Sequence, residues 1–323
     1  MILSVCADKG APGVTTLVTA LGLIWPAERV VLEADVSGAD LPFRLQHQDG
    51  DRLLDPQPSV LALAADVRAP QPEHDLAWYA QPTALGVPVV PGGLSAEAFT
   101  AMAWLWPQVV EVAASWPGTV LADLGRLQPG DPAAPVAATS TALLLLARPD
   151  LEGLYHLRER VSELAATVGR PTLDRTPLAV VVRARAGAEG NAGVEQVRAL
   201  LESIGSPVPV LGVFAEDPAA VAALRGRQLT RKLLNTELLR SARTLAESLL
   251  IRWPQLAPLP AGRGLPAPGP AAPTATLPAY CAAAAPRHEP VQPAGEVPAA
   301  PWTPGWGRLP GLRRHPRAGQ VSA

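Results

Sequence analysis

Lysine is almost missing from this chain of 323 residues, in which Lys9 and Lys232 are the only two. Cysteine is as rare, and the spacing of Cys6 and Cys281 fits neither a metal site nor a disulfide framework. This usage is typical of a reducing compartment, so we expect a cytoplasmic protein. No run of about 18 uncharged apolar residues occurs, so we expect no membrane-spanning helix. The first apolar run is short and leads into a glycine loop, so we expect no secretory leader.

Charge is also low, and it is unevenly spread. The formal net charge is -2, but residues 254–323 hold six arginines and only two glutamates, so the preceding part of the chain is acidic. An acidic body argues against a protein that coats nucleic acid with its whole surface. Residues 254–323 are also rich in proline, alanine and glycine, and such a segment buries too little apolar surface to offset its ordering entropy. We expect a domain over residues 1–253 and a disordered basic tail over 254–323.

Short apolar runs alternate with helical patterns throughout residues 1–253. The apolar runs predict strands at 2–7, 29–32, 85–90, 119–122, 142–147, 178–182 and 208–214. Helices are predicted at 15–25, 58–67, 95–116 with a bend at Pro107, 151–168, 191–204, and in a segment that ends near 253. In the helix 151–168 we expect Arg160 on the solvated side. This alternation predicts one doubly wound α/β domain with a mostly parallel, seven-stranded sheet.

A glycine loop joins the first predicted strand to the first predicted helix. Its residues are Asp8-Lys9-Gly10-Ala11-Pro12-Gly13-Val14-Thr15-Thr16. Glycines let the backbone approach a polyphosphate, and the first turn of the helix offers unpaired N–H groups with a partial positive charge. Gly13 and Thr15 fit the phosphate-loop pattern G-x-x-x-x-G-K-[ST]. Asp8 stands at its first glycine and Val14 at its lysine. The alternative is a glycine turn that binds no ligand.

Carboxylates close two other predicted strands. The apolar run at 29–32 ends in Glu33 and Asp35, and the run at 119–122 leads into Asp123 and Gly125, which close that strand. The carboxyl ends of parallel strands face the ligand crevice of such a sheet. Asp123 is therefore our candidate for orienting magnesium and its waters beside the loop. The alternative for Glu33 and Asp35 is that both acids are simply solvated at a strand end.

A lysine that opens such a loop resembles the deviant Walker A phosphate loop of the ParA and MinD ATPases, which reads K-G-G-x-G-K-[ST]. The resemblance covers about residues 1–253 and implies a P-loop NTPase that binds ATP and Mg²⁺ as a homodimer. It implies two catalytic residues: Lys9, which would reach the nucleotide of the partner subunit, and Asp35, which would position the attacking water. It implies magnesium ligation by Thr15 and Asp123. The nucleotide-binding set is Lys9, Gly10, Ala11, Pro12, Gly13, Val14, Thr15, Thr16 and Asp123.

Three positions depart from that family pattern. Val14 cannot supply the charge of the second lysine, and the loss of one charged contact of about 1.5–3 kcal/mol weakens binding about ten- to a hundredfold. Glu33 stands at the first acid of the family's D-x-D. Arg183 stands where members often place an asparagine against the adenine. Because phosphoryl transfer depends on cations that neutralise the transferring group, we expect ATP hydrolysis to be weak or absent.

The resemblance implies a spatial organiser that acts through a nucleotide-dependent dimer in chromosome or plasmid partitioning, or in positioning a septum or other machinery. The alternative, which Val14 favours, is a non-hydrolysing scaffold or localisation factor for pilus or secretion assembly. The expected partners are a second copy of the chain and a cargo protein that contacts its surface or tail. Non-specific DNA is a further candidate, through a basic run whose alternative is a plain solvated face. That run contains Arg225, Arg227, Arg231 and Lys232.

Overall fold

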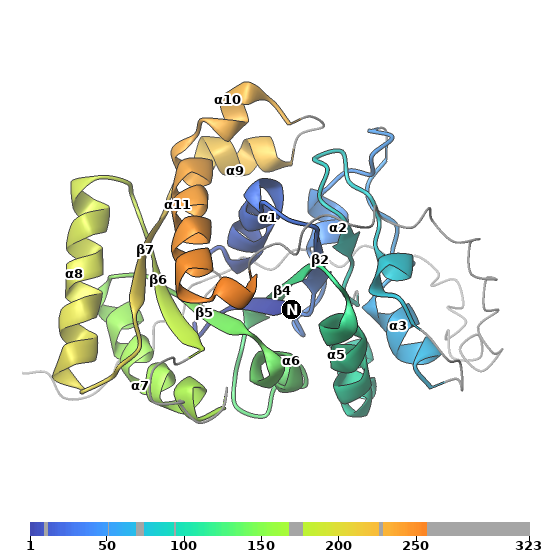
Figure 1. The fold of residues 1–323 in the computed structure, drawn as a ribbon, viewed down its shortest axis with the longest axis horizontal. Coiled ribbons are helices and arrows are strands. Elements are labelled where there is room, and N and C mark those ends of the chain that lie inside the picture. The colour runs from blue at the N-terminus through green and yellow to red at the C-terminus, as the bar shows by residue number, and fades with distance from the viewer. Residues whose placement is uncertain are drawn as a thin grey trace, which may run out of the picture. The chain divides into compact units, whose positions relative to one another are not determined.

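A single sheet of seven parallel strands organises the described part of the chain, in the order β3-β2-β4-β1-β5-β6-β7. The computed structural model describes residues 1–9, 12–50, 52–68, 74–93, 95–167, 177–225 and 229–256, with only the backbone at 165–167 (Figure 1). The strands are β1 (Ile2–Ala7), β2 (Arg29–Glu33), β3 (Val89–Val90), β4 (Thr119–Arg126), β5 (Ala142–Ala147), β6 (Leu178–Ala184) and β7 (Val210–Ala215). β1 lies at the centre, between β4 and β5.

Helices cover both faces of this sheet. The α-helices are α1 (Val14–Ile24), α2 (Leu41–Arg44), α3 (Val60–Asp66), α4 (Ala96–Ala101), α5 (Trp106–Ser115), α6 (Ala134–Thr139), α7 (Leu151–Thr167), α8 (Ala188–Ser203), α9 (Pro218–Leu224), α10 (Arg231–Leu234) and α11 (Glu237–Arg252). Three 3-10 helices, η1 (Leu76–Tyr79), η2 (Ala103–Leu105) and η3 (Pro254–Leu256), complete the described elements. Figure 1 shows α1 and α11 on one side of the sheet, with α5, α6 and α7 on the other.

The strands are apolar along their whole length because both of their faces are covered. Every residue of β1 and β5 is buried, as expected for the centre of a parallel sheet. One core cluster packs α3, α5, α6, α7 and α8 against one face, and a second packs α1 and α11 against the other. The prediction of a doubly wound α/β domain is therefore confirmed.

Two predicted element boundaries and one predicted exposure were wrong. β4 continues through Asp123 to Arg126, so Asp123 lies inside the strand and does not close it. Pro107 does not bend a continuous helix, because α4 ends at Ala101 and Pro107 lies in the first turn of α5, where a missing N–H is tolerated. Arg160 in α7 is only 8% exposed, so it does not belong to a solvated face.

Glu33 ties two loops to the end of β2. Its side chain is 1% exposed, which excludes the alternative that it is solvated at the strand end. Oε1 accepts hydrogen bonds from the backbone N–H groups of Asp40 (2.6 Å) and Leu41 (2.8 Å), and Oε2 accepts one from Gly92 (2.9 Å). Burial raises the pKa of Glu33, and these three backbone donors act against the rise. The residue therefore fixes the chain after β2 and after β3.

No helix among the described residues is long and apolar enough to cross a membrane. The predicted tail lies outside the described residues except for Pro254–Leu256, which form η3. The division into residues 1–253 and 254–323 stays a prediction.

Replacing Glu33 by alanine should lower the free energy of unfolding by about 3 kcal/mol or more. The change leaves three backbone N–H groups without their acceptor in a buried site, and each such group costs about 1–3 kcal/mol. Chemical denaturation measures the loss. Glu111→Ala, which removes an exposed carboxylate from α5, is the control and should stay within about 0.5 kcal/mol of the parent. A loss under about 1 kcal/mol for Glu33→Ala would contradict this role.

Candidate functional site

The turn between β1 and α1 presents backbone N–H groups at the carboxyl edge of the sheet. Gly13 precedes α1 with φ 102° and ψ 33°, a left-handed conformation that favours glycine. Leu17 donates to the carbonyl of Gly13 (2.8 Å), which leaves the N–H groups of the first three helical residues without an intrahelical acceptor. Among the described residues no side chain caps this end, and no acid lies in the first turn. The end of α1 is therefore open to an anion.

Asp123 of β4 faces this helix end from the neighbouring strand. The carboxylate is fully buried, and its Oδ1 accepts a hydrogen bond from the N–H of Gly125 (3.0 Å). Oδ2 has no hydrogen-bond partner among the described residues. Buried polar atoms are normally paired, so an orphaned carboxylate oxygen calls for a partner that is not part of the chain.

The pKa of Asp123 reflects this isolation. Burial raises it from 3.8 to about 7, and the nearby carboxylates of Glu33 and Asp35 add to the rise. The Thr15 side chain and the Gly125 amide act against it. Thr15 is thus close enough to influence Asp123 electrostatically, although Oδ2 stays without a regular hydrogen bond. Oδ2 is therefore an open ligand position.

Asp35 lies against the same stretch of β4. A Cβ atom added to Gly125 would lie 1.9 Å from Oδ2 of Asp35, so only glycine leaves room for that carboxylate. Gly125 also has φ 52°, in the left-handed region. The N–H of Ser37 donates to Oδ1 of Asp35 (2.9 Å) and holds the side chain in place. The fold therefore brings Thr15, Asp35 and Asp123 together.

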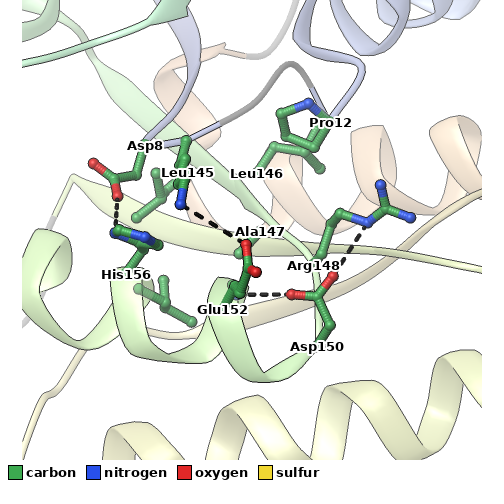
Figure 2. A pocket seen from close by; sticks show the side chains of 12 residues that line it. Asp8, Pro12, Leu145, Leu146, Ala147, Arg148, Asp150, Glu152 and His156 are labelled. Atoms are coloured by element: carbon green, nitrogen blue, oxygen red, sulfur yellow. Dashed lines mark hydrogen bonds and ion pairs between the residues drawn. The ribbon is translucent and has the colours of Figure 1, made fainter. Parts of the chain in front are cut away.

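Lys9 does not join these three residues. Its ammonium pairs with Glu152 of α7 at 3.8 Å, and both side chains are mostly exposed. The pair borders a cavity of about 260 Å³ whose lining includes Asp8, Lys9, Pro12, Arg148, Glu152 and His156 (Figure 2). Figure 2 shows Glu152 and His156 extending from α7 towards the loop. Lys9 is therefore the exposed cation of the loop.

Asp8 fastens the start of the loop to the other elements. Its carboxylate pairs with Arg160 of α7 (2.6 Å) and with Nδ1 of His156 (3.1 Å). Its backbone carbonyl accepts a hydrogen bond from Nε of Arg126 (2.8 Å). The ion pair with Arg160 explains why an acid, Asp8, stands at the first glycine position of the loop pattern. It also explains why Arg160 is buried. Sequence reasoning missed the pair because a helix pattern does not say which of its charged residues meets a distant loop.

The remaining predicted loop residues fall into three groups. Gly10 and Ala11 lie outside the described residues. The Val14 side chain is 3% exposed and packs in the core beneath α1, so of this residue only the backbone is left for a ligand. Thr15 and Thr16 border a second cavity of about 30 Å³. Neither cavity is lined by Asp35 or Asp123.

Arg183, at the end of β6, lies close to the loop, and the sequence alone did not predict this proximity. Its Cζ and Nε atoms lie 3.9 Å from the position a Cβ atom would take at Gly13. The guanidinium packs on the ring of Phe214, with Cζ 4.7 Å from the ring centroid, and Nη1 donates to the carbonyl of Ala215 (2.6 Å). A cation therefore stands beside the glycine that opens α1.

The basic run after α9 is exposed. The side chains of Arg225, Arg231 and Lys232 are exposed, and Arg227 lies outside the described residues. No cluster of three or more His, Cys, Asp or Glu residues able to hold a metal occurs within the described ranges. A magnesium ion that takes its ligands from a hydroxyl, one carboxylate and phosphate oxygens needs no such cluster.

No family model matches the sequence, and no curated protein sequence does. Solved structures do match. The cell division ATPase MinD of Pyrococcus furiosus shares 21% identity at TM-score 0.57, over 77% of this chain and 97% of that one. MinD of Pyrococcus horikoshii in complex with Mg-ADP shares 19% at TM-score 0.56, over 77% and 95%. An ATP complex of McdA from Cyanothece shares 16% at TM-score 0.57, over 77% and 95%. The chain therefore has the MinD/ParA P-loop NTPase fold.

Replacing Asp123 by asparagine should stabilise the protein at pH 8 when magnesium and nucleotide are absent. Folding raises the pKa of Asp123 from 3.8 to about 7. The contribution of this carboxyl group to the free energy of unfolding is therefore fully present below about pH 4 and is lost as the pH rises through 7. The neutral amide keeps an oxygen for Gly125 and avoids this loss, which is on the order of 4 kcal/mol at about 1.36 kcal/mol per pKa unit.

Urea unfolding at pH 4 and pH 8 measures this effect. The two proteins should be close in stability at pH 4 and should diverge at pH 8, with the asparagine variant more stable. A variant less stable than the parent at pH 8 would mean that the buried oxygen already has a favourable partner.

Proposed function

We propose that this protein binds Mg²⁺ and ATP at the end of α1 and acts as a spatial organiser through a nucleotide-dependent dimer, with little or no hydrolysis. The observation that carries the proposal is the fully buried oxygen of Asp123, which has no hydrogen-bond partner in the part of the chain that the structure describes and lies beside Thr15 at a helix end that no described side chain caps. The same fold occurs in a cell division ATPase and in a protein assigned to plasmid partition, which supports the proposed role in positioning. The object that is positioned would be a chromosome, a plasmid, a septum or another assembly.

The residues at the helix end fit a magnesium–nucleotide complex. Magnesium prefers oxygen ligands, and the Thr15 hydroxyl together with Asp123, directly or through water, would supply them. The open N–H groups of α1 would take the phosphates. When bound, magnesium would neutralise phosphate charge. Asp35, held by Ser37 at the same edge, is our candidate for orienting a water near the nucleotide.

Val14 limits what this site can do with the nucleotide. Phosphoryl transfer depends on cations that stabilise the transferring group, and the position that carries a lysine in the usual loop is here a buried aliphatic residue. The same observation favours a second candidate function, a scaffold or localisation factor that binds nucleotide and never hydrolyses it. The two functions share the binding site and differ in turnover.

Lys9 is our candidate for the contact between two subunits. It is exposed at the rim of the larger cavity, and its pair with Glu152 is a surface pair that contributes little stability. It is therefore free to exchange that partner for the phosphates of a nucleotide in a second copy of the chain. A surface contact to DNA through Arg225, Arg231 and Lys232 remains a candidate, as does a cargo protein.

Isothermal titration of the purified full chain with ATP and magnesium should show saturable binding. The heat should fall sharply when magnesium is withheld, because Thr15 and Asp123 would act through the metal. A phosphate-release assay on the same sample should detect slow turnover for the organiser and none for the scaffold. A protein that binds no ATP at millimolar concentration would refute both.

Replacing Lys9 by alanine should abolish ATP-dependent dimerisation and leave ATP binding by the monomer largely intact. The reason is that Lys9 would act on the nucleotide of the other subunit. Multi-angle light scattering with and without ATP measures the mass. Lys232→Ala is a matched control, because it removes the only other lysine, which is exposed in α10. If Lys9→Ala dimerises like the parent, the assigned role of Lys9 is wrong.

A further inference from the structure

The loop pattern at the start of α1 has Val14 at the position of the usual lysine, and the guanidinium of Arg183 lies next to this loop. Val14 directs an aliphatic side chain into the core beneath α1. The guanidinium of Arg183 arrives from β6 instead and lies 3.9 Å from the Cβ position of Gly13, the residue before α1. Residues 13 and 183 are far apart in the sequence, so this approach is a property of the fold.

The surroundings of Arg183 hold it in this place. Phe214 supports the guanidinium from β7, and the carbonyl of Ala215 binds Nη1 at 2.6 Å. The carboxylate of Glu216 lies 4.0 Å from Nε, and it is shared with Arg148 at 3.5 Å. The Arg183 side chain is 11% exposed. Its Nη2 atom has no hydrogen-bond partner among the described residues and is left for a ligand.

We propose that Arg183 binds the phosphates of the nucleotide and supplies the positive charge that Val14 has removed from the loop. This inference rests on the proposed nucleotide site and adds a residue to it. The guanidinium stands beside the glycine at the open end of α1, where an anion would be bound. Arginine suits this task, because its planar group stays charged and its fork matches phosphate oxygens.

Two observations favour the phosphates over the adenine base as the group that Arg183 contacts. Phe214 already packs against the guanidinium, so less of it is left to stack on a base. The Arg183 atoms Cζ and Nε lie 3.9 Å from the Cβ position of Gly13, and the turn at Gly13 leads directly into the free N–H groups of α1. A charged donor beside those groups adds to the same anion site.

The test compares the full chain with Arg183→Gln in titrations against Mg-ATP and against magnesium tripolyphosphate, which has no base. We expect Arg183→Gln to weaken both ligands about ten- to a hundredfold, the usual effect of losing one charge-assisted contact. Arg183→Lys, which keeps the charge and loses the fork, should lose less. Arg185→Gln is the matched control, with the same change at an exposed position two residues further along, and should stay within about twofold of the parent. Circular dichroism and thermal unfolding establish that each variant is folded.

Each outcome decides the proposal. Weaker binding of both ligands supports it. Weaker binding of ATP with unchanged tripolyphosphate would place Arg183 at the base and overturn it. Unchanged binding of both ligands in Arg183→Gln, or equal losses in Arg183→Lys and Arg183→Gln, would also overturn it and leave the proposed function standing. If the parent binds neither ligand, the proposed function fails and the role of Arg183 fails with it.

Discussion

A carboxylate buried at the carboxyl edge of the sheet is the constraint from which the rest of the site follows. Within the described part of the chain one oxygen of Asp123 is unpaired, no cation contributes to its pKa, and two other carboxylates lie near enough to raise that pKa. An isolated charge in such surroundings is costly, so the group either takes up a proton or meets a cation from outside. The raised pKa and the open oxygen thus have one cause. Under our proposal the free protein gives up stability that a bound ion restores.

Glu33 and Asp123 are carboxylates that are buried to a similar extent, but they differ in how fully their oxygens are hydrogen-bonded. Three backbone N–H groups satisfy Glu33, and its environment is complete without any ligand. One N–H satisfies Asp123, and its second oxygen is left over. The number of local hydrogen bonds therefore distinguishes Glu33, which holds two loops, from Asp123, which has an oxygen open to a ligand. Burial alone does not separate them, because both side chains are at most 1% exposed.

The order of strands and helices could be predicted because apolar runs, prolines and glycines act locally along the chain. The meeting of Asp35 and Asp123 followed from the rule that parallel strands end at one edge. The pairing of Asp8 with Arg160, which are 152 residues apart, could not be predicted, since it depends on which side of α7 turns inward. The same holds for Arg183 of β6, whose approach to Gly13 depends on the direction of one side chain across the intervening strand β5.

An arginine on β6 in place of a lysine at the start of α1 would affect the hydrolysis of the nucleotide as well as its affinity. A lysine on the loop has a flexible stem, and its ammonium is able to follow charge as it shifts during phosphoryl transfer. Arg183 is held by Phe214 and by the carbonyl of Ala215, so its guanidinium is fixed in one place. Under our proposal such a fixed cation would stabilise the bound nucleotide and would add little that is specific to the transition state, and uniform binding of this kind does not raise turnover. Under our proposal this arrangement would therefore favour a protein that responds to bound nucleotide over one that hydrolyses it.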